Sequence, residues 1–490
     1  MKKAINALVA VFATVAMAIA GFVGAGSALA DGAYSITAPA NGHTYEAYQV
    51  FTGDLSKKGV LSNLQYGSNA KQTGNVAESV AENLAAAQSD EAVLKIVKQH
   101  VNLAGTPAAT IHSGETRTVA AAGYYLIKDK DNSVSGTDSY TTYIMQVVGN
   151  VTIQPKSDVP SFQKKVKDIN DTTGDTSEWQ DSADYDVNDS VPFQLKATLP
   201  SNYTNYKTYY LAFHDVEEKG LTFNTDSVKV YVDNTPVDST KYKVKTTGLT
   251  DGCTFEVVFT DLKTAVAATN NSEITVDYTS KLTDEAVLGN QGNVNKAKLQ
   301  FSNNPNSEQD GESTSTGETP WDSVIVFTYK VVVNKVNEKR KPLKGAAFKL
   351  EKNYKNGGWK IVKELPAGNN TIFEFKGLDD GEYKLSETET PAGYNTIQPI
   401  TFTVTAKHTS TWDGENRDSV LTELSGSKDS GEISFAPDKS GGSLTANVIN
   451  KSGSSLPETG GMGTIVLYVA GAALVVAAGA YFTLKKKYTR

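Results

Sequence analysis

The chain has 490 residues and a formal net charge of −8 at pH 7. An acidic chain without a large cluster of Lys and Arg is not typical of a protein that binds nucleic acid or an anionic membrane surface, so the sequence argues against both kinds of partner. The 23 Tyr residues against 4 Met and 5 His favour β-rich extracellular modules.

The N-terminus predicts export from the cell. Lys2 and Lys3 precede an apolar segment over residues 7–23. Residues 28–30 then read Ala-Leu-Ala, the small-x-small pattern that signal peptidase cleaves. We therefore expect residues 1–30 to be a signal peptide and the protein to be secreted.

Cysteine usage limits how the exported chain can be crosslinked. The single cysteine, Cys253, can form no internal disulfide. No His lies near it in the sequence, so Cys253 is expected to be a small buried hydrophobe rather than a nucleophile. The modules must then rely on ordinary cores or on another kind of crosslink.

The first module is expected over residues 31–158 and combines strands with a helical insertion. Apolar residues repeat at helical spacing over about 75–102, which predicts one or two amphipathic helices packed on a sheet. Pro155 and Pro160 mark its end. The predicted strands are 34–37, 45–51, 116–119, 123–127 and 140–153.

Two further modules are expected over residues 159–328 and 329–451, followed at 452–490 by a spacer and a C-terminal signal. Both alternate apolar and polar residues with polar turns between them, which is the pattern of antiparallel sandwiches. Residues 303–319 are expected to be a polar loop without periodicity. The predicted strands of the second module are 190–195, 209–213, 227–232, 254–259, 273–278, 296–301 and 323–329. Those of the third are 331–333, 346–350, 372–375, 381–385, 400–404 and 444–449.

A lysine opens the second module and an asparagine lies in its last long strand. Because side chains alternate along a strand, Lys164 falls on the apolar face and is expected to point into the core. By the same parity Asn303 shares a face with Phe301, and Asp215 shares one with Phe213. The third module repeats this arrangement.

In the third module Lys335 stands at the start, Asn450 at the end and Glu387 in a central strand. Glu387 alternates inward with Tyr383 and Leu385. A buried Lys needs a partner of opposite charge. Each module is therefore expected to bring a Lys, an acid and an Asn together in apolar surroundings.

Such a trio can form an amide crosslink. Burial lowers the pKa of Lys and raises that of a carboxylic acid, so the amine can be neutral while the acid keeps its proton. The amine attacks the Asn carbonyl, the acid donates to the amide oxygen and shuttles protons, and ammonia leaves. The alternative for each trio is a surface Lys, an Asn in a turn and an acid in a surface ion pair.

The residues of the third module carry a resemblance to a known family. Lys335, residues 345–348, residues 383–394 and Asn450 resemble a collagen-adhesin B-type domain, and Glu387 matches the position of its catalytic glutamate. The resemblance implies a mainly β chain of tandem immunoglobulin-like β-sandwich domains of the collagen-adhesin A and B types.

The second module resembles the isopeptide-forming second domain of sortase-assembled pilus shaft subunits, whose catalytic acid is commonly an aspartate. That resemblance implies Asp215 as the acid and Lys164 and Asn303 as the crosslinked pair, with the adjacent Asn304 as an alternative to Asn303. For the third module the implied crosslink joins Lys335 and Asn450.

Pilus shaft subunits place an acyl-acceptor lysine at the end of the first domain, in a segment of the form aromatic-Pro-Lys. Here Gln154, Pro155 and Lys156 stand in that place, with Gln instead of the aromatic residue, and imply Lys156 as the intermolecular acceptor. Lys165 is a rival, because it should lie on the face opposite to Lys164 and stay exposed.

The C-terminus carries three parts in order. An apolar run over about 464–484 is long enough as a helix to span a bilayer, and Lys485–Lys487 and Arg490 follow it as a cytoplasmic basic tail. The whole resembles a Gram-positive cell-wall sorting signal, in which a sortase attacks the Thr-Gly carbonyl; a plain transmembrane anchor is the alternative. The sorting motif before the run consists of Leu456, Pro457, Glu458, Thr459 and Gly460.

Two acidic loops lack the spacing of a calcium site. Residues 168–171 begin like an EF-hand loop, but Thr173 replaces the required Gly and Trp179 the bidentate acid. Residues 129–132 are acidic but show no pattern that is specific to a calcium-binding loop. Both loops are expected to be solvated turns. The sequence predicts no metal and no cofactor.

The resemblances imply a structural backbone pilin, secreted and anchored to the cell wall as part of a fimbrium at the cell surface. The expected partners are a class C-type pilus sortase, a housekeeping sortase, peptidoglycan, other copies of the chain and a tip or accessory pilin. A singly wall-anchored surface adhesin of the same modules is the first alternative. An enzyme fits worst, because no nucleophile-base set, zinc spacing or phosphate loop appears and each trio would react only once.

Overall fold

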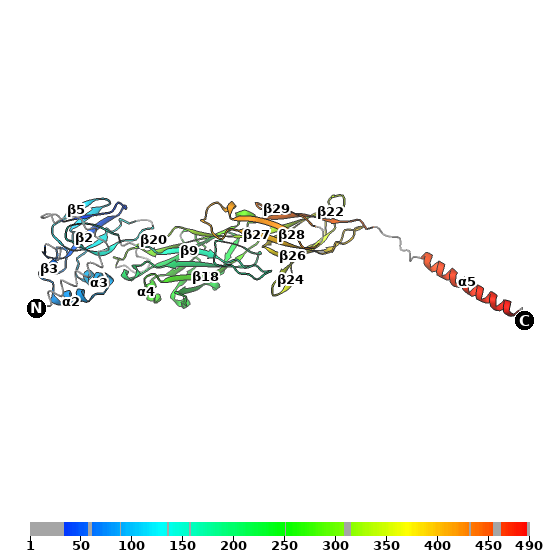
Figure 1. Ribbon diagram of the computed structural model, residues 1–490, viewed down its shortest axis with the longest axis horizontal. Helices are drawn as coiled ribbons and strands as arrows, with labels where there is room; N and C mark the ends of the chain where they lie inside the picture. The colour runs from blue at the N-terminus through cyan, green and yellow to red at the C-terminus, as the bar shows by residue number, and fades with distance from the viewer. Residues whose placement is uncertain are drawn as a thin grey trace.

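The computed structural model describes residues 34–56, 61–88, 90–134, 137–155, 158–249, 251–307, 315–430, 433–453 and 462–487. Figure 1 shows β-rich modules that follow one another along the long axis of the molecule. We call residues 34–155 the N-terminal module, residues 158–327 the middle module and residues 329–453 the C-terminal module. The prediction of a mainly β chain of tandem modules with few helices is confirmed.

The N-terminal module contains two sheets, with strand orders β5-β1-β8 and β3-β2-β6-β7, and β4 also pairs with β2. The helices α2 (Glu78–Ala86) and α3 (Asp90–His100) bury Leu84, Val93 and Val97 against Val50 and Leu126 of the larger sheet. The predicted amphipathic helices are therefore confirmed. The strands are β1 (Tyr34–Thr37), β2 (Thr44–Leu55), β3 (Leu61–Tyr66), β4 (Ala109–His112), β5 (Thr116–Val119), β6 (Gly123–Asp129), β7 (Thr142–Val147) and β8 (Asn150–Thr152).

The middle module contains a seven-stranded sheet, β10-β21-β19-β12-β17-β16 with β20 beside β19, and a six-stranded sheet, β15-β14-β18-β11-β9 with β13 beside β18. Its short helices are α4 (Leu262–Ala265), η1 (Tyr203–Asn205), η2 (Thr225–Ser227), η3 (Ser239–Lys241) and η4 (Gly289–Gln291). Its strands are β9 (Ser161–Val166), β10 (Ser182–Asp184), β11 (Ser190–Thr198), β12 (Leu211–Glu217), β13 (Leu221–Phe223), β14 (Lys229–Val232), β15 (Thr235–Pro236), β16 (Lys243–Lys245), β17 (Phe255–Phe259), β18 (Glu273–Leu282), β19 (Asn293–Ser302), β20 (Thr316–Glu318) and β21 (Asp322–Phe327).

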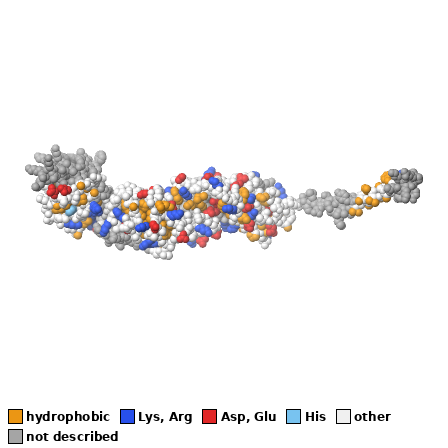
Figure 2. Space-filling model, turned by 90° about the horizontal axis from the view of Figure 1, so that it is seen from below, with side chains coloured by type: hydrophobic (Ala, Val, Ile, Leu, Met, Phe, Trp, Pro, Cys, Tyr) orange, Lys and Arg blue, Asp and Glu red, His pale blue; other side chains and the backbone are white. Residues whose placement is uncertain are grey.

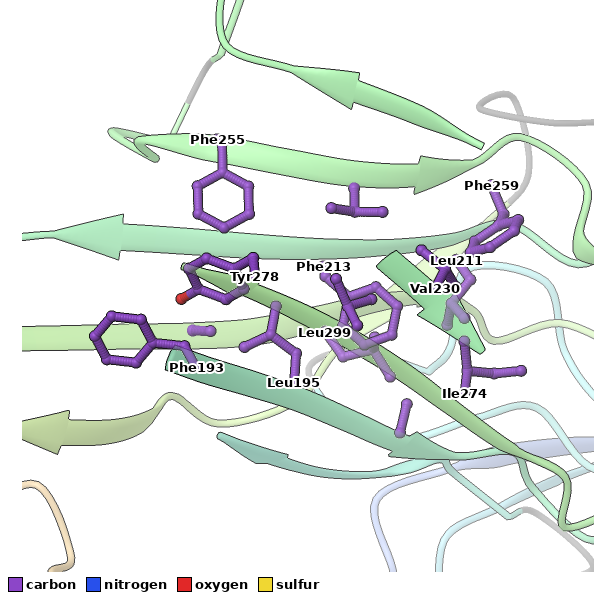
Figure 3. Close-up of a cluster of buried hydrophobic side chains, with 14 of the residues drawn as sticks. Phe193, Leu195, Leu211, Phe213, Val230, Phe255, Phe259, Ile274, Tyr278 and Leu299 are labelled. Atoms are coloured by element: carbon purple, nitrogen blue, oxygen red, sulfur yellow. The ribbon is translucent and has the colours of Figure 1, made fainter. Parts of the chain in front are cut away.

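The core of the middle module lies between these two sheets. Burial alternates along β11 and β18, as the sequence pattern predicts. Phe193 and Tyr278 from the six-stranded sheet share one buried cluster with Phe213, Phe255 and Leu299 from the seven-stranded sheet (Figure 3). The expectation of a loop without structure over residues 303–319 is wrong at its end, where β20 pairs with β19.

The C-terminal module contains the sheets β25-β22-β30-β29 and β24-β23-β26-β27-β28. Its first strand and its last strand, β22 and β30, pair in parallel from Lys330 opposite Ser443 to Asn337 opposite Asn450. The 3-10 helix is η6 (Arg417–Ser419). The strands are β22 (Tyr329–Asn337), β23 (Ala347–Tyr354), β24 (Gly358–Leu365), β25 (Ile372–Leu378), β26 (Gly381–Glu389), β27 (Ile400–His408), β28 (Leu421–Lys428), β29 (Phe435–Asp438) and β30 (Ser443–Asn450).

The C-terminal segment is helical: α5 spans Met462–Lys487. Within the part of the chain that the structure describes, no helix is both long and apolar enough to cross a membrane. The membrane-spanning role of this segment therefore stays an expectation from the sequence.

The surface of the described modules carries both signs of charge. Figure 2 shows Lys and Arg interspersed with Asp and Glu along the visible face rather than gathered into one basic patch. This distribution agrees with the net charge of −8. It offers no electrostatic footprint for nucleic acid on that face.

Candidate functional site

Lys164 lies fully buried in the core of the middle module. Alternation along β9 turns it inward, and the pairing of β9 with β11 sets it opposite Leu195. Its Nζ donates to Asp215 Oδ2 at 2.5 Å and to the Tyr278 hydroxyl at 2.7 Å. The Tyr278 hydroxyl donates to the same Asp215 oxygen at 2.8 Å. These contacts form a compact buried cluster, which we call the Lys164 cluster.

Burial controls the protonation of this cluster. Desolvation lowers the pKa of the Lys164 ammonium, although Asp215 acts in the opposite direction. Desolvation also raises the pKa of the Asp215 carboxyl group. Both shifts favour a neutral amine beside a protonated acid, which is the form in which Lys164 is a nucleophile.

The amide that reaches the Lys164 cluster belongs to Asn295, not to Asn303. Asn295 is fully buried, and its Nδ2 donates to the Tyr278 hydroxyl at 2.9 Å. Asn303 Nδ2 instead donates to the carbonyl of Asp138 in the N-terminal module at 3.2 Å. The predicted pairing of Lys164 with Asn303 is therefore wrong.

The register of β19 explains this error. Asp215 on β12 lies opposite Ala297, two residues from Asn295. Asn303 lies six residues beyond Ala297, which is about 20 Å along a strand. Asn295 and Asn303 are separated by an even number of residues, so their side chains point to the same face of the sheet. The alternation along the strand therefore identified the correct face but not the correct residue on it. Asn304 does not replace it, because its Oδ1 accepts from the backbone N of Asn306 at 2.9 Å in a local turn.

A second carboxyl group, that of the partly buried Glu217, lies beside the Asn295 amide. Its Oε1 accepts hydrogen bonds from the Ser280 hydroxyl and, at 3.4 Å, from Asn295 Nδ2. Desolvation, and then the charge of Asp215, raises the pKa of Glu217 to about 8. Sequence reasoning missed Glu217, although it shares the inward parity of Asp215 two residues earlier on β12.

The C-terminal module brings its predicted trio together, and we call this group the Lys335 cluster. Lys335 is fully buried, and its Nζ lies 3.4 Å from Glu387 Oε1 and 3.4 Å from the carbonyl oxygen of Val448. Asn450 Nδ2 donates to Glu387 Oε2 at 3.0 Å. Desolvation lowers the pKa of Lys335. The Glu387 carboxyl group thus bridges the amine and the amide.

Both asparagines present an unpaired carbonyl. Among the described residues, the side-chain oxygens of Asn295 and Asn450 are buried without a hydrogen-bond partner, and so are those of Asn290, Asn303 and Asn306. This feature therefore fits the crosslink sites without identifying them. An unpaired buried polar atom costs about 1–3 kcal/mol, so it calls for an explanation. An amide oxygen with no partner can receive a proton or hydrogen bond from a neighbouring acid when its carbonyl is attacked.

The acidic loop at residues 168–171 lies at the junction of the middle and C-terminal modules. Asp171 Oδ2 is 3.1 Å from Lys352 Nζ, and Asp168 Oδ2 is 3.2 Å from His408 Nε2. The expectation of a solvated turn is therefore wrong here, because both carboxylates are used in ion pairs between modules.

The other acidic loop, residues 129–132, also differs from a solvated turn at its first residue. Asp129 is fully buried, and its carboxylate accepts from the backbone N of Thr141 at 2.5 Å and lies 3.0 Å from His43 Nδ1. The side chain of Asp131 is 75% exposed, as expected for a residue in a solvated turn.

Not every expected site residue can be placed. Lys156, the residues Leu456–Gly460 of the sorting motif and the leader 1–30 lie outside the described residues. The rival acceptor Lys165 is described, and it is not freely exposed. Its Nζ pairs with Asp181 Oδ1 at 2.5 Å, and 26% of its side chain is accessible.

Cys253 departs from its expected role as a buried hydrophobe. It is half-buried, and its Sγ lies 3.6 Å from His214 Nδ1. The two residues are 39 positions apart in the sequence. The pairing of β12 with β17, which places His214 opposite Glu256, brings them together.

Comparisons with known proteins agree with this architecture. Residues 187–305 match the family described as Gram-positive pilin backbone subunit 2, Cna-B-like domain. This segment is similar to the backbone subunits of Gram-positive pili. Residues 329–418 match a second family, the SpaA prealbumin-like fold domain.

A curated relative is the trypsin-resistant surface T6 protein of Streptococcus pyogenes serotype M6, which is 26% identical over 272 residues, or 51% of this chain. The match spans 46% of that protein, less than half its length. The solved T6 backbone pilin has a TM-score of 0.50 at 18% identity and covers 87% of this chain and 100% of its own, so the fold is shared. The major pilin SpaD of Corynebacterium diphtheriae has a TM-score of 0.48 at 18% identity, with 87% and 100% coverage.

Proposed function

We propose that this chain is the structural backbone subunit of a covalent pilus at the surface of a Gram-positive cell. The match of residues 187–305 to the pilin backbone family carries the proposal. The Lys164 and Lys335 clusters support it, because a subunit of a long polymer gains from covalent bonds inside each module. The chain acts as a building block, and its internal chemistry occurs once per cluster.

The proposed crosslinks join Lys164 to Asn295 and Lys335 to Asn450. The neutral lysine amine attacks Cγ of the asparagine, a C–N bond forms, and the bond from Cγ to Nδ2 breaks. The proton released by the amine passes through Asp215 or Glu387 to the departing Nδ2, which leaves as ammonia. The contacts of Nζ with the acid and of the amide with Tyr278 or Glu387 support these roles.

Intact-mass spectrometry of the chain produced without sortase tests the crosslinks. The expected mass is lower than the sequence mass by two ammonia molecules. Asp215→Ala and Glu387→Ala should each restore one ammonia, whereas Glu389→Ala, an exposed acid at the end of the same strand as Glu387, should restore none. A wild-type mass equal to the sequence mass would contradict the crosslinks. It would not decide whether the chain polymerises into a pilus, which the immunoblots below test separately.

Assembly would use the two ends of the secreted chain. A class C-type pilus sortase cleaves between Thr459 and Gly460 and transfers the Thr459 acyl group to Lys156 of another copy, and a housekeeping sortase joins the finished polymer to peptidoglycan. The motif at residues 456–460 and the relatives support this route. A tip or accessory pilin would complete the fibre.

Immunoblots of cell-wall extracts test the assembly. The wild type should give an SDS-resistant ladder, and Lys156→Ala should abolish it while the monomer remains folded. Lys165→Ala is the matched control and should keep the ladder. If no ladder forms in the wild type, the chain is a singly anchored surface protein such as an adhesin, and the backbone proposal fails.

A further inference from the structure

His214, Asp251 and Cys253 meet on the seven-stranded sheet of the middle module. Strand alternation along β12 turns Asp215 into the core and His214 to the outer face. Asp251 and Cys253 lie just before β17, on the segment that follows β16. The three ligand atoms, one from each side chain, all lie within 4.8 Å of one another.

The orientation of the His214 ring leaves one nitrogen facing anionic groups. Gln300 Nε2 donates to Thr316 Oγ1 at 3.2 Å, which turns Gln300 Oε1 toward His214 Nε2 at 3.3 Å. Nε2 must then carry the hydrogen, and in the neutral ring Nδ1 has a lone pair. Nδ1 lies 2.9 Å from Asp251 Oδ2, which is a hydrogen-bond distance, so a cation bound at Nδ1 would displace a proton shared with that carboxylate.

Two further groups face the same nitrogen. Cys253 Sγ lies 3.6 Å from His214 Nδ1, and Glu256 Oε1 lies 3.5 Å from it. A single proton on Nδ1 could bond well to only one of these three neighbours. A metal ion at Nδ1 could contact more than one of them at once.

The distances fit a small tetrahedral ion. Ligands at about 2.0–2.3 Å from a zinc ion lie roughly 3.3–3.8 Å from one another. The separation of 3.6 Å between Nδ1 and Sγ falls in that range. The separation of 2.9 Å between Nδ1 and Asp251 Oδ2 would have to open by about half an ångström. Asp251 can move, because 24% of its side chain is exposed.

The surrounding charges also suit a divalent ion. Asp251, Glu256 and Glu318 are paired with only two lysines, Lys245 and Lys298. The three carboxylates exceed the two lysines by one negative charge, and a divalent cation that binds would replace the thiol proton of Cys253.

We propose that His214, Asp251 and Cys253 form a binding site for a zinc-type divalent cation on the outer face of the middle module. A mixed nitrogen, sulfur and carboxylate set selects zinc over calcium or magnesium, which prefer oxygen ligands alone. Three protein ligands leave the fourth position to water. Gln300 positions the His214 ring and is not itself a ligand.

Bound metal would tie the segment before β17 to β12, the strand that also carries Asp215. The site is independent of the proposed crosslinks, because it lies on the opposite face of the sheet. It requires neither sortase nor polymerisation, so its test stands apart from the proposed function.

Cobalt binding to the full chain tests the site. Titration with Co²⁺ should give one bound ion with a sulfur-to-cobalt charge-transfer band in the near ultraviolet, and Zn²⁺ should displace it. Cys253→Ser should abolish the band and weaken Zn²⁺ binding by about tenfold or more, and His214→Gln should weaken it to a similar extent. Cys253→Ser is nearly isosteric at a half-buried position, so it decides the test even if His214→Gln does not fold.

Another group of His and carboxylate side chains supplies the internal control. Asp168, Asp184 and His408 also have ligand atoms within 4.8 Å, but without a thiol. Cobalt bound there would give no sulfur band and would be unaffected by Cys253→Ser. That result, or the absence of any Co²⁺ or Zn²⁺ binding, would overturn the proposal.

Discussion

Two asparagines of equal parity on and just after β19 differ in what their amide groups touch. Asn295 contacts Tyr278 in the Lys164 cluster, whereas Asn303 contacts the backbone of the N-terminal module. Asn295→Ala should therefore raise the intact mass of the chain toward its sequence mass by one ammonia molecule, after correction for the substitution. Asn303→Ala should leave the mass deficit unchanged. The opposite result would return the crosslink to Asn303.

Glu217 should make the middle module less stable as the pH rises. Its pKa is raised from 4.5 to about 8 in the folded chain, so the folded state binds the proton more tightly than the unfolded state between these values. The free energy of unfolding then falls as pH rises through this window, by at most about 4–5 kcal/mol. Glu217→Gln should reduce the fall in melting temperature between pH 5 and pH 8.

The control for this titration is Glu285→Gln, an exposed acid of the same module. Asp189 and Asp380 have pKa values raised to about 7, so they contribute in the same direction and part of the slope should remain in Glu217→Gln. Melting curves of wild type and Glu217→Gln that shift in parallel with pH would contradict a titrating Glu217.

The site residues that the sequence predicted correctly lie on the first and last strands of a module. Lys335 and Asn450 stand on the first and last strands of the C-terminal module, which pair in parallel, so their parity and their positions agree. Asn295 could not be predicted, because its position depends on the register between β12 and β19, and that register is set by hydrogen bonds between strands far apart in the sequence.

At the scale of elements, periodicity predicted the helices and strands that bury a full face, but it did not predict every edge strand. α3 and β11 bury one face each, so their apolar spacing is readable. The strands β24 and β28 were missed, and both are edge strands of their sheet. β24 is largely exposed, and a strand that buries little leaves no clear alternation.

The junction between the middle and C-terminal modules depends on one lysine of β23. Lys352 is fully buried, and its Nζ bonds to Asp171 at 3.1 Å, to Asp186 at 2.8 Å and to Asp379. The three carboxylates come from both modules and raise the pKa of Lys352 against the effect of burial. No periodicity in the sequence reveals this group, because its members come together only on docking.

Lys352→Met should leave the carboxylates of Asp186 and Asp379 buried without their cation. Breaking a buried ion pair from one side costs about 3–5 kcal/mol. Calorimetry should show a lower melting temperature for the variant. Lys349→Met on the same strand is the control, since 27% of that side chain is exposed and its loss should cost about 1 kcal/mol or less. Equal melting temperatures for the two variants would contradict a stabilising role of the junction lysine.

At the scale of the whole molecule, the proposed crosslinks should govern resistance to unfolding. A covalent link that closes a loop of about 100 residues stabilises by about 4–5 kcal/mol if chain entropy dominates, as for a disulfide. Asp215→Ala and Glu387→Ala should each lower the melting temperature of one module and speed its proteolysis by trypsin. Variants that lose the crosslink by mass but melt and digest like the wild type would show that the bonds do not contribute to stability.

The parallel pairing of β22 and β30 also fixes how the C-terminal module would carry tension. Because both strands run in the same direction, the chain enters the module at one end and leaves it at the other. Traction applied through its neighbours would load the hydrogen bonds between these strands together, in shear, instead of opening them one after another. With Lys335 joined to Asn450, the load would pass from β22 directly to the end of β30. The polypeptide between these two residues would then carry no tensile load.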